Sequence, residues 1–465
     1  MNMNALERFI ADLGDIPVAT DPGTIKLKSR DFFWFSPILK PLLEDKRAFA
    51  IVRPRNRDEL IRVVALAARR RIALTTRGGG TGNYGQCVPL DGGIVLDMTG
   101  LDRILETRPG LVKVEAGKMM LEIDRELKPT GWELRVFPST RATATIGGFI
   151  CGGAAGAGSI TWGQIGDAGA VQAMTLISME ETPRIFTLEG EETMKAVHAY
   201  GVNGIVLDVT LPTAPRQDWA EAIVTFDSLV DCARFAQALA EDQIIAKKLI
   251  SVHAPGISAF FKRIQPFAAV DKALAIIMVS EPQLWAAGVH AKAFGGTISY
   301  TRDAAAADTA AFDSHDPIPP LYEFCWNHTT LRALKVEPDI TYLQVLFPMG
   351  KNIEALAWAE KEFAGEILWH LEFQKRYAGF TNSSLPLVRF RSAERLQEIT
   401  AKLEANGLKV SNPHIYTLEG TGWKRIKADQ EGLKREADPY FLLNPGRLPS
   451  LEAAHALAAG TMAAE

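Results

Sequence analysis

The sequence has few cysteines and no long apolar run. Its four cysteines, Cys87, Cys151, Cys232 and Cys325, are widely separated and form no C-x-x-C pair. This pattern argues against a disulfide framework, a zinc knuckle or an iron–sulfur relay, and it is typical of a reducing compartment. No window reaches the roughly 18 apolar residues of a membrane helix, and the first residues lack the apolar core of a secretory signal. We expect a cytoplasmic protein, with attachment to the inner face of the membrane left open.

The chain also has no excess of positive charge. It carries 51 Lys and Arg against 55 Asp and Glu, which gives a net charge of −4 over 465 residues. Because nucleic acids bind surfaces rich in Lys and Arg, no nucleic-acid partner is expected. A hydrophobic fraction of 47% is typical of a globular protein, and the length suggests roughly two to four domains.

Segments typical of strands and of helices alternate from residue 48 to residue 212. After Pro215 glycine becomes rare and a second pattern begins, with strand-like segments such as LAIIMVSE, DITYLQVLFP and EILWHLEF. Strands separated by helices in this way usually form one antiparallel sheet with helices on one face. The sequence therefore predicts an α+β fold with at least two domains.

The stretch TTRGGGTGNYGQCVPLDGG contains G-x-G-x-x-G at Gly80, Gly82 and Gly85, after the strand-like RIALTT. A dinucleotide-binding Rossmann turn needs a helix directly after these glycines, because the helix N-terminus binds the pyrophosphate. Pro89 and two further glycines prevent such a helix. The loop therefore argues against NAD. Successive backbone amides without a Cβ can instead form a concave site for a diphosphate.

Two other stretches leave alternatives open. The small residues of PSTRATATIGGFICGGAAGAGSITWG, residues 138–163, suit a backbone that lies flat against a large planar ligand, or a close contact between a helix and a sheet. The aromatic SRDFFWFSPIL, residues 29–39, suits an arm buried over the first domain, a lining for the substrate pocket or a membrane-surface patch.

Taken in order, AIVRPRNRDELIRVVALAARRRIALTTRGGGTG, PSTRATATIGG and YGVNGIVLDVTLP resemble the FAD-binding domain (PCMH type) of the vanillyl-alcohol oxidase superfamily. The C-terminal DPYFLLNPGRL is similar to the ending of the branch that contains FAD-linked D-lactate dehydrogenases and the D-subunits of glycolate oxidases. The resemblance implies a PCMH-type FAD-binding domain of two α/β subdomains over residues 1–213. It also implies an antiparallel-sheet cap domain that binds substrate over 214–410, and a C-terminal segment, 411–465, that returns to the flavin domain.

The resemblance also implies the cofactor and its ligands. The glycine loop would hold the FAD diphosphate, the segment from Pro138 would run beside the isoalloxazine and ribityl chain, and Asn444 would approach the pyrimidine end. The implied FAD-binding residues are Arg77, Gly78, Gly79, Gly80, Thr81, Gly82, Pro138, Ser139, Thr143, Thr145, Ile146, Gly147, Gly148, Gly152, Gly153, Gly163, Gly204, Ile205 and Asn444. Covalent members of the superfamily carry a histidine where this chain has Thr81, so non-covalent FAD is expected.

A divalent metal is not expected. The D-2-hydroxyacid dehydrogenases of this branch form a metal site with an HxGDGNxH-type motif and a glutamate. This chain has no such motif, and Asn412-Pro413-His414 stands where that glutamate would precede a histidine. Cys325-x-x-His328 has a metal-like spacing but lacks a second pair of ligands.

A flavin takes a hydride from a C–H bond when a nearby base removes the adjacent O–H proton. The resemblance places a histidine beside the flavin at His414, which is the first candidate for this base, and His328 and Tyr342 are further catalytic candidates. Arg332, His370 and Asn412 are the candidates for substrate binding. For His328 and Arg332 the alternative is a solvated helix face. His370 and Glu372 share one face of a strand, directed to substrate or, as we favour here, to solvent. Tyr342 and Gln344 share a face of the strand-like DITYLQVLF and could line the same cavity.

The sequence thus predicts an FAD-dependent oxidoreductase that oxidises a CH–OH group of a small molecule. A 2-hydroxy acid is the preferred substrate class. An aromatic alcohol oxidase, an NADPH-dependent flavin reductase and a flavin-binding subunit without catalysis are the alternatives. Oxygen, a quinone, a cytochrome or an electron-transfer flavoprotein would accept the electrons. The protein could be a monomer or a homodimer.

Overall fold

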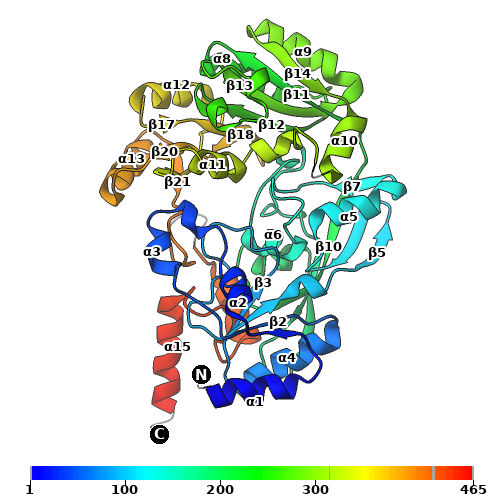
Figure 1. The fold of residues 1–465 in the computed structure, drawn as a ribbon, viewed down its shortest axis with the longest axis vertical. Coiled ribbons are helices and arrows are strands. Elements are labelled where there is room, and N and C mark those ends of the chain that lie inside the picture. Colours follow the sequence, from blue (N-terminus) through cyan, green and yellow to red (C-terminus); the bar gives the residue numbers. More distant parts are fainter. Residues whose placement is uncertain (1–2, 314, 421–424, 463–465) are drawn as a thin grey trace.

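The computed structural model describes residues 3–313, 315–420 and 425–462, and the chain forms two lobes (Figure 1). The lower lobe in this view, called here the first domain, contains the N-terminal part of the chain and the C-terminal helix. The upper lobe, called here the cap, contains the middle of the chain. The two lobes correspond to the two predicted patterns of strands and helices.

The first domain begins with a four-stranded sheet in the order β1-β2-β4-β3, in which β2, β4 and β3 are parallel. Its strands are β1 (Val18–Ala19), β2 (Ala50–Val52), β3 (Leu74–Arg77) and β4 (Ile94–Asp97). Its helices are α1 (Met3–Leu13), α2 (Pro22–Lys28), α3 (Leu39–Leu43) and α4 (Arg57–Arg69). Helix α4 begins where the Asn56 side chain accepts a hydrogen bond from the Glu59 amide at 3.0 Å, as an N-cap residue does.

A second sheet completes the first domain, with the order β5-β6-β10-β8-β9 and with β7 paired to β10. Its strands are β5 (Ile104–Arg108), β6 (Leu111–Glu115), β7 (Trp132–Leu134), β8 (Ala173–Ile177), β9 (Ile185–Glu189) and β10 (Ile205–Pro215). Between them lie α5 (Met120–Leu127), α6 (Ile146–Gly152) and α7 (Ser159–Trp162). The glycine-rich stretch 138–163 therefore includes two short helices, α6 and α7. Its backbone packs closely on Ala116, because a Cβ on Gly147 would lie 2.7 Å from the Cβ of Ala116.

The cap is built on an eight-stranded antiparallel sheet in the order β14-β11-β13-β12-β18-β19-β16-β21. Its strands are β11 (Trp219–Phe226), β12 (Lys247–His253), β13 (Ala273–Ser280), β14 (Thr297–Arg302), β16 (Gln344–Leu346), β18 (His370–Arg376), β19 (Gly379–Ser384) and β21 (Lys409–Ser411). The predicted antiparallel sheet is thus present.

Two segments predicted as single strands each divide between two sheets. DITYLQVLFP forms β15 (Ile340–Tyr342) and β16, and EILWHLEF forms β17 (Ile367–Leu368) and β18. The first strand of each pair joins β20 (Leu387–Arg389) in a separate three-stranded sheet. The division comes at buried Leu343 and Trp369, and an apolar pattern alone does not reveal such a change of sheet.

The remaining helices pack on the cap and at the C-terminal end of the chain. The cap helices are α8 (Leu229–Glu241), α9 (Leu284–Ala293), α10 (Ala304–Phe312), α11 (Asn327–Leu334), α12 (Asn352–Glu362) and α13 (Ala393–Ala405), and α14 (Ala428–Ala437) and α15 (Pro449–Met462) follow. Helix α8 contacts the central cap strands β11, β12 and β13. No helix among residues 3–313, 315–420 and 425–462 is long and apolar enough to cross a membrane.

The C-terminal segment packs against the first domain. The Leu74 amide donates to the Leu442 carbonyl at 2.8 Å, and the Asn444 amide donates to the Leu74 carbonyl at 2.7 Å. The segment therefore runs beside β3, directly before the glycine loop.

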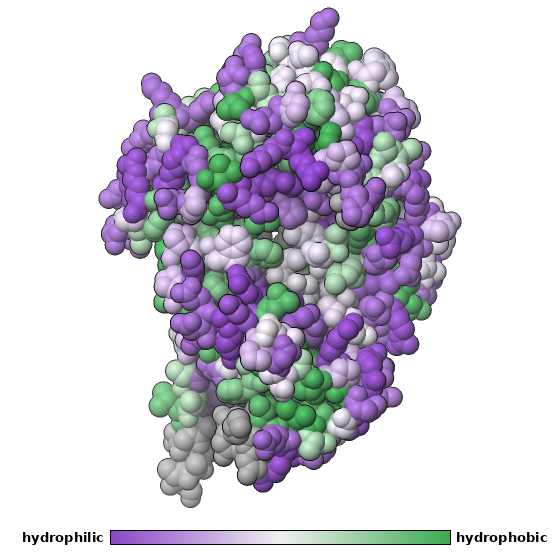
Figure 2. All heavy atoms as spheres, viewed as in Figure 1, coloured by the Kyte–Doolittle hydropathy of each residue, from purple (hydrophilic) through white to green (hydrophobic). Residues whose placement is uncertain are grey.

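In the space-filling view, hydrophilic residues cover most of the visible face of the cap, and hydrophobic residues gather toward the lower end of the first domain (Figure 2).

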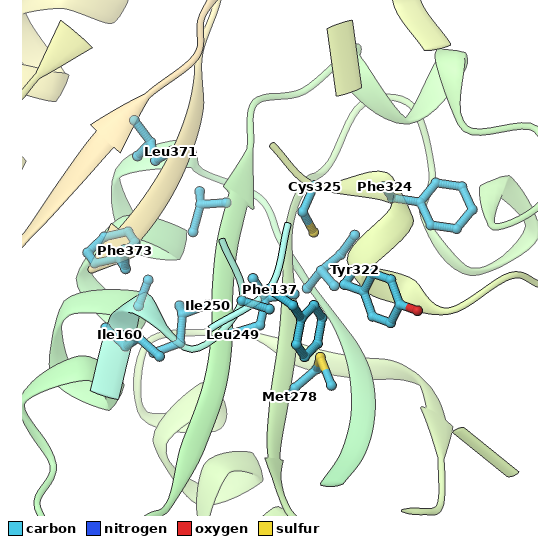
Figure 3. Close-up of a cluster of buried hydrophobic side chains, with 14 of the residues drawn as sticks. Phe137, Ile160, Leu249, Ile250, Met278, Tyr322, Phe324, Cys325, Leu371 and Phe373 are labelled. Atoms are coloured by element: carbon cyan, nitrogen blue, oxygen red, sulfur yellow. The ribbon is translucent and has the colours of Figure 1, made fainter. Parts of the chain in front are cut away.

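The two domains share a hydrophobic core. Phe137 and Ile160 of the first domain pack near Leu249 and Met278 of the cap (Figure 3). Beside this core, the Lys248 ammonium is buried, donates to Glu133 Oε1 at 2.6 Å and lies 4.7 Å from the Trp162 ring centroid. This ion pair joins the cap to the first domain.

We expect Lys248→Met to lower the free energy of unfolding by about 3 kcal/mol, because it leaves the Glu133 carboxylate largely buried without its cation. Urea or thermal unfolding of the protein measures the change. Lys402→Met is the matched control, since Lys402 pairs with Glu362 at the surface, where a pair contributes at most about 1 kcal/mol. Equal losses in the two variants would contradict the prediction.

Candidate functional site

A cavity of about 320 Å³ lies between the first domain and the cap. On one side it is lined by the glycine loop after β3, the segment from Pro138 to α6 and the residues before β10. Strands of the cap sheet and the start of α11 line the other side. The cavity is therefore closed by both domains.

The glycine loop approaches the segment 143–145 so closely that no side chain fits between them. A Cβ on Gly78 would overlap Thr145 Oγ1, and a Cβ on Gly79 would overlap the Thr143 carbonyl oxygen. No helix follows the loop among residues 78–93, which confirms the prediction that this is not a Rossmann turn. The loop thus presents bare backbone to the cavity, and such backbone suits a bound anion.

Most of the predicted FAD-binding residues line the cavity. They are Arg77, Gly78, Gly79, Gly80, Thr81, Gly82, Pro138, Ser139, Thr145, Gly147, Gly148, Gly152, Gly153, Gly204 and Ile205. Thr143, Ile146, Gly163 and Asn444 do not belong to the lining. Asn444 lies directly behind it, where its Nδ2 donates to the Gln86 and Tyr200 carbonyls at 2.9 and 2.8 Å.

Strand alternation accounts for most of the cap-sheet residues that line the cavity, and Val345 and Ser384 of the opposite face also belong to the lining. Ser383 is directly opposite Leu346, and Leu346 is directly opposite Lys409, so these three side chains share a face of the sheet. The residues of this face that line the cavity are Gln344, Leu346, Arg376, Ser383, Lys409 and Ser411. Of these residues only Gln344 was expected at the cavity from the sequence, because the common face depends on the pairing of β16, β18, β19 and β21.

His414, the first candidate base, does not line the cavity. It is 4% exposed, its Nδ1 lies 2.7 Å from Ser36 Oγ and its Nε2 lies 3.0 Å from the Tyr342 carbonyl oxygen. A carbonyl only accepts hydrogen bonds, so Nε2 carries a proton and Nδ1 accepts from the Ser36 hydroxyl. Asn412 accepts from the His414 amide at 2.8 Å and also lies outside the lining.

His328 and Arg332 lie on α11, behind the cavity wall. Arg332 donates from Nε to the Glu323 carbonyl at 3.1 Å and stacks 4.0 Å from the Phe324 ring centroid. Burial lowers the pKa of His328 to about 4, and the nearby positive charges of Arg332 and Lys335 act in the same direction. The histidine is therefore neutral at physiological pH.

Tyr342 is fully buried behind the wall, and Tyr84 lies in the wall. The Gln344 amide donates to the Tyr84 hydroxyl. Burial raises the pKa of both phenols. Tyr342 and Gln344 do not act as neighbours on one strand, because Tyr342 belongs to β15 and Gln344 to β16.

The prediction that His370 and Glu372 face solvent is wrong. Both are fully buried inside the cap, with His370 Nε2 2.7 Å from Glu372 Oε1. Glu372 is directly opposite Ser383, so it does share the face that lines the cavity. The segment around Trp326 covers it, and the Trp326 amide donates to Glu372 Oε1 at 2.6 Å.

Asp31, from the aromatic stretch 29–39, lines the cavity beside the glycine loop. It is 3% exposed, and its Oδ1 accepts from the Phe33 amide at 2.9 Å. Burial raises the pKa of this carboxyl to about 6, against the opposing effects of that amide and of the Arg447 guanidinium. Phe33 and Phe35 are buried, so the stretch is an arm packed over the first domain that also contributes to the lining.

Residues 48–182 match the family model described as the FAD binding domain. This part of the chain is therefore an FAD-binding domain, and FAD is its cofactor, which confirms the resemblance seen in the sequence. The bare backbone of the glycine loop fits the diphosphate of this group. Among the described residues, no group of three or more His, Cys, Asp and Glu side chains is arranged to hold a metal ion.

The chain is also similar to proteins of known activity. It is 40% identical over 124 residues to D-2-hydroxyglutarate dehydrogenase of Escherichia coli (strain K12), over 25% of this chain and only 12% of that protein. It is 22% identical over 453 residues to D-lactate dehydrogenase of Anaerostipes hadrus, over 86% of this chain and 90% of that protein.

A solved structure of alkyldihydroxyacetonephosphate synthase matches with a TM-score of 0.71 at 14% identity, covering 96% of this chain and 85% of that one. The match confirms the predicted α+β fold, in which an FAD-binding domain is joined to an antiparallel cap.

Gly79→Ala is expected to abolish or greatly weaken FAD binding, because the added Cβ overlaps the Thr143 carbonyl and moves the loop. The ratio of flavin to protein absorbance after purification measures bound FAD. Gly166→Ala is the control, since nothing lies within 4 Å of a Cβ at that position. If both variants retain FAD equally, the loop is not the FAD-binding backbone.

Asp31→Asn tests the buried carboxyl. Because the folded-state pKa is raised from 3.8 to about 6, Asp31 stabilises the fold most below pH 3.8 and loses this contribution as the pH rises to about 6. The amide does not ionise, so the variant should gain about 3 kcal/mol relative to the parent protein between pH 3.8 and pH 7. Urea unfolding across this range measures the difference, with the exposed Asp91→Asn as control. A difference in the free energy of unfolding that does not change with pH would contradict the prediction.

Proposed function

We propose that the protein is an FAD-dependent oxidoreductase that oxidises the CH–OH group of a small 2-hydroxy acid. The FAD-binding domain and the similarity to a D-2-hydroxyglutarate dehydrogenase and a D-lactate dehydrogenase support the reaction class. The cap supplies the support for an acid substrate.

The observation that carries the proposal is the charge of the cap side of the cavity. In the described part of the lining, the charged residues that the cap contributes are Arg376 and Lys409, and both are cations. Arg376 Nη1 donates to Gln164 Oε1 of the first domain, which orients the guanidinium at the junction of the two domains. A carboxylate is the group that a guanidinium and an ammonium bind best.

The chain's own residues bind and orient the substrate, and FAD, when bound, accepts the hydride. A base must take the hydroxyl proton. Among the described lining residues the histidine is His198, and this supports His198 as the proton acceptor in place of His414. Both ring nitrogens of His414 already have partners within the protein.

The test is the visible spectrum of the FAD-bound protein under anaerobic conditions. D-Lactate, D-2-hydroxyglutarate or another 2-hydroxy acid should bleach the flavin band, and denaturation should release free FAD. Bleaching by an aromatic alcohol or by NADPH alone would select one of the alternative activities. Bleaching by none of these compounds would overturn the proposal.

Arg376→Met and Lys409→Met should each raise KM for the bleaching acid by roughly tenfold, because each removes one charged partner of the carboxylate. Steady-state kinetics measure the change. Lys375→Met is the matched control: it removes a lysine from the same strand, but strand alternation directs that side chain to the opposite face. A rise in KM with Lys375→Met as large as with Arg376→Met would contradict the assignment.

A further inference from the structure

Trp326 combines an unusual backbone with a position in the cavity wall. It precedes α11, with φ of 53° and ψ of −142°, a region that glycine adopts freely and that strains other residues. Trp326 and Asn327 both line the cavity. Strained residues persist only where their surroundings hold them, and they concentrate at binding and catalytic sites.

The surroundings that hold Trp326 come from the buried face of the cap sheet. Its amide donates to Glu372 Oε1 at 2.6 Å, and its carbonyl accepts from the Thr329 amide at 3.1 Å. Glu372 Oε1 also accepts from the Ser251 hydroxyl at 3.0 Å and lies 2.7 Å from His370 Nε2. The Glu372 carboxyl group thus has two partners, Ser251 and His370, in addition to the Trp326 amide.

Strand pairing explains how these groups meet. Ser251 is directly opposite Glu372, and His253 is directly opposite His370, on the neighbouring strands β12 and β18. The two imidazole rings stack with centroids 4.5 Å apart and an interplanar angle of 10°. All four residues are fully buried, so none of them contacts a ligand. They can influence the cavity only through the backbone that covers them.

Trp326 Nε1 and Asn327 Oδ1 are both buried and have no hydrogen-bond partner within the described part of the chain. A buried polar atom without a partner is costly, and one in a cavity wall can be satisfied by the cavity's occupant. The wall therefore offers one donor and one acceptor close together at the cap side.

We propose that Trp326 and Asn327 contact the substrate, and that Glu372 is a positioning residue that holds the strained Trp326 backbone in the cavity wall. The identity of the ligand rests on the proposed function, whereas the link between Glu372 and Trp326 does not. Trp326 was not a candidate from the sequence, and Glu372 was named there only as a neighbour of His370 on one strand face. Strand pairing brings Glu372 beneath Trp326.

The test uses Glu372→Leu, which removes the acceptor at similar size, and Glu372→Gln, which keeps an acceptor oxygen. In the FAD-bound protein, Glu372→Leu should weaken binding of oxalate, a carboxylate that cannot be oxidised at a C–H bond, by at least tenfold. Perturbation of the flavin spectrum measures this binding. In Glu372→Gln, oxalate binding should stay within about threefold of that of the parent protein. For these variants, KM for substrate should change more than kcat.

Glu221→Leu is the matched control. Glu221 is another fully buried glutamate of the cap sheet, and its Oε1 accepts from the Leu321 amide at 2.8 Å, five residues before Trp326. Glu221 does not line the cavity. Equal weakening of oxalate binding by Glu221→Leu and Glu372→Leu would reduce Glu372 to a structural role and overturn the proposal. So would unchanged binding in Glu372→Leu.

The same Glu372 substitution, made in a protein that carries Trp326→Gly, tests whether Glu372 acts through Trp326. Trp326→Gly relieves the backbone strain and removes the indole, so Glu372→Leu should add less than a twofold effect in that variant. A full additional effect would show that Glu372 acts independently of Trp326 and would overturn the proposal. If Glu372→Leu does not fold, Glu372→Asp, which withdraws the carboxylate by one methylene, takes its place with the same expectations.

Failure of the proposed function gives a different result. If the parent protein does not respond to oxalate or to any 2-hydroxy acid, quenching of flavin emission by acrylamide replaces ligand binding as the readout. Glu372→Leu should then increase quenching, because the Trp326 wall loosens, whereas Glu372→Gln and Glu221→Leu should not. Equal quenching in the parent protein and Glu372→Leu would overturn the positioning role itself.

Discussion

Two backbone segments that are far apart in the sequence approach so closely that no side chain fits between them. Gly78 and Gly79 meet Thr143 and Thr145, and Gly147 meets Ala116 in the same manner. These contacts bring the two sheets of the first domain together and leave a surface of bare amides facing inward. The cap covers that surface and completes the cavity.

The cap covers the cavity with one face of its sheet, and the same face serves two purposes. Near β21 it presents Arg376 and Lys409 to the cavity. Near β12 it carries Ser251, His253, His370 and Glu372, which are sealed beneath Trp326. Polar residues thus continue along the face beyond the cavity, and the backbone of a single tryptophan separates the part that meets a ligand from the part that supports it.

The sequence allowed the FAD-binding side of the site to be predicted and left the cap side hidden. Glycine at Gly78, Gly79 and Gly147 is a direct chemical requirement of close approach, so the requirement is visible in the residue type. The cap residues Ser383, Arg376 and Lys409 reach the cavity only because β16, β18, β19 and β21 pair in one register. The strand-like segments at Tyr342 and His370 also change sheets, and this separated candidates that alternation had placed together. His414 followed a motif position, yet the fold gives both of its nitrogens protein partners.

The C-terminal segment beside β3 has a consequence for the order in which the protein is made. Asn444 donates to the Gln86 carbonyl in the glycine loop across 358 residues of sequence, and the whole cap is encoded between the two. A ribosome therefore releases the glycine loop long before it releases the residues that brace it. The wall behind the loop is complete only once the cap has emerged, so stable loading of FAD comes late, after synthesis of the domain that covers it.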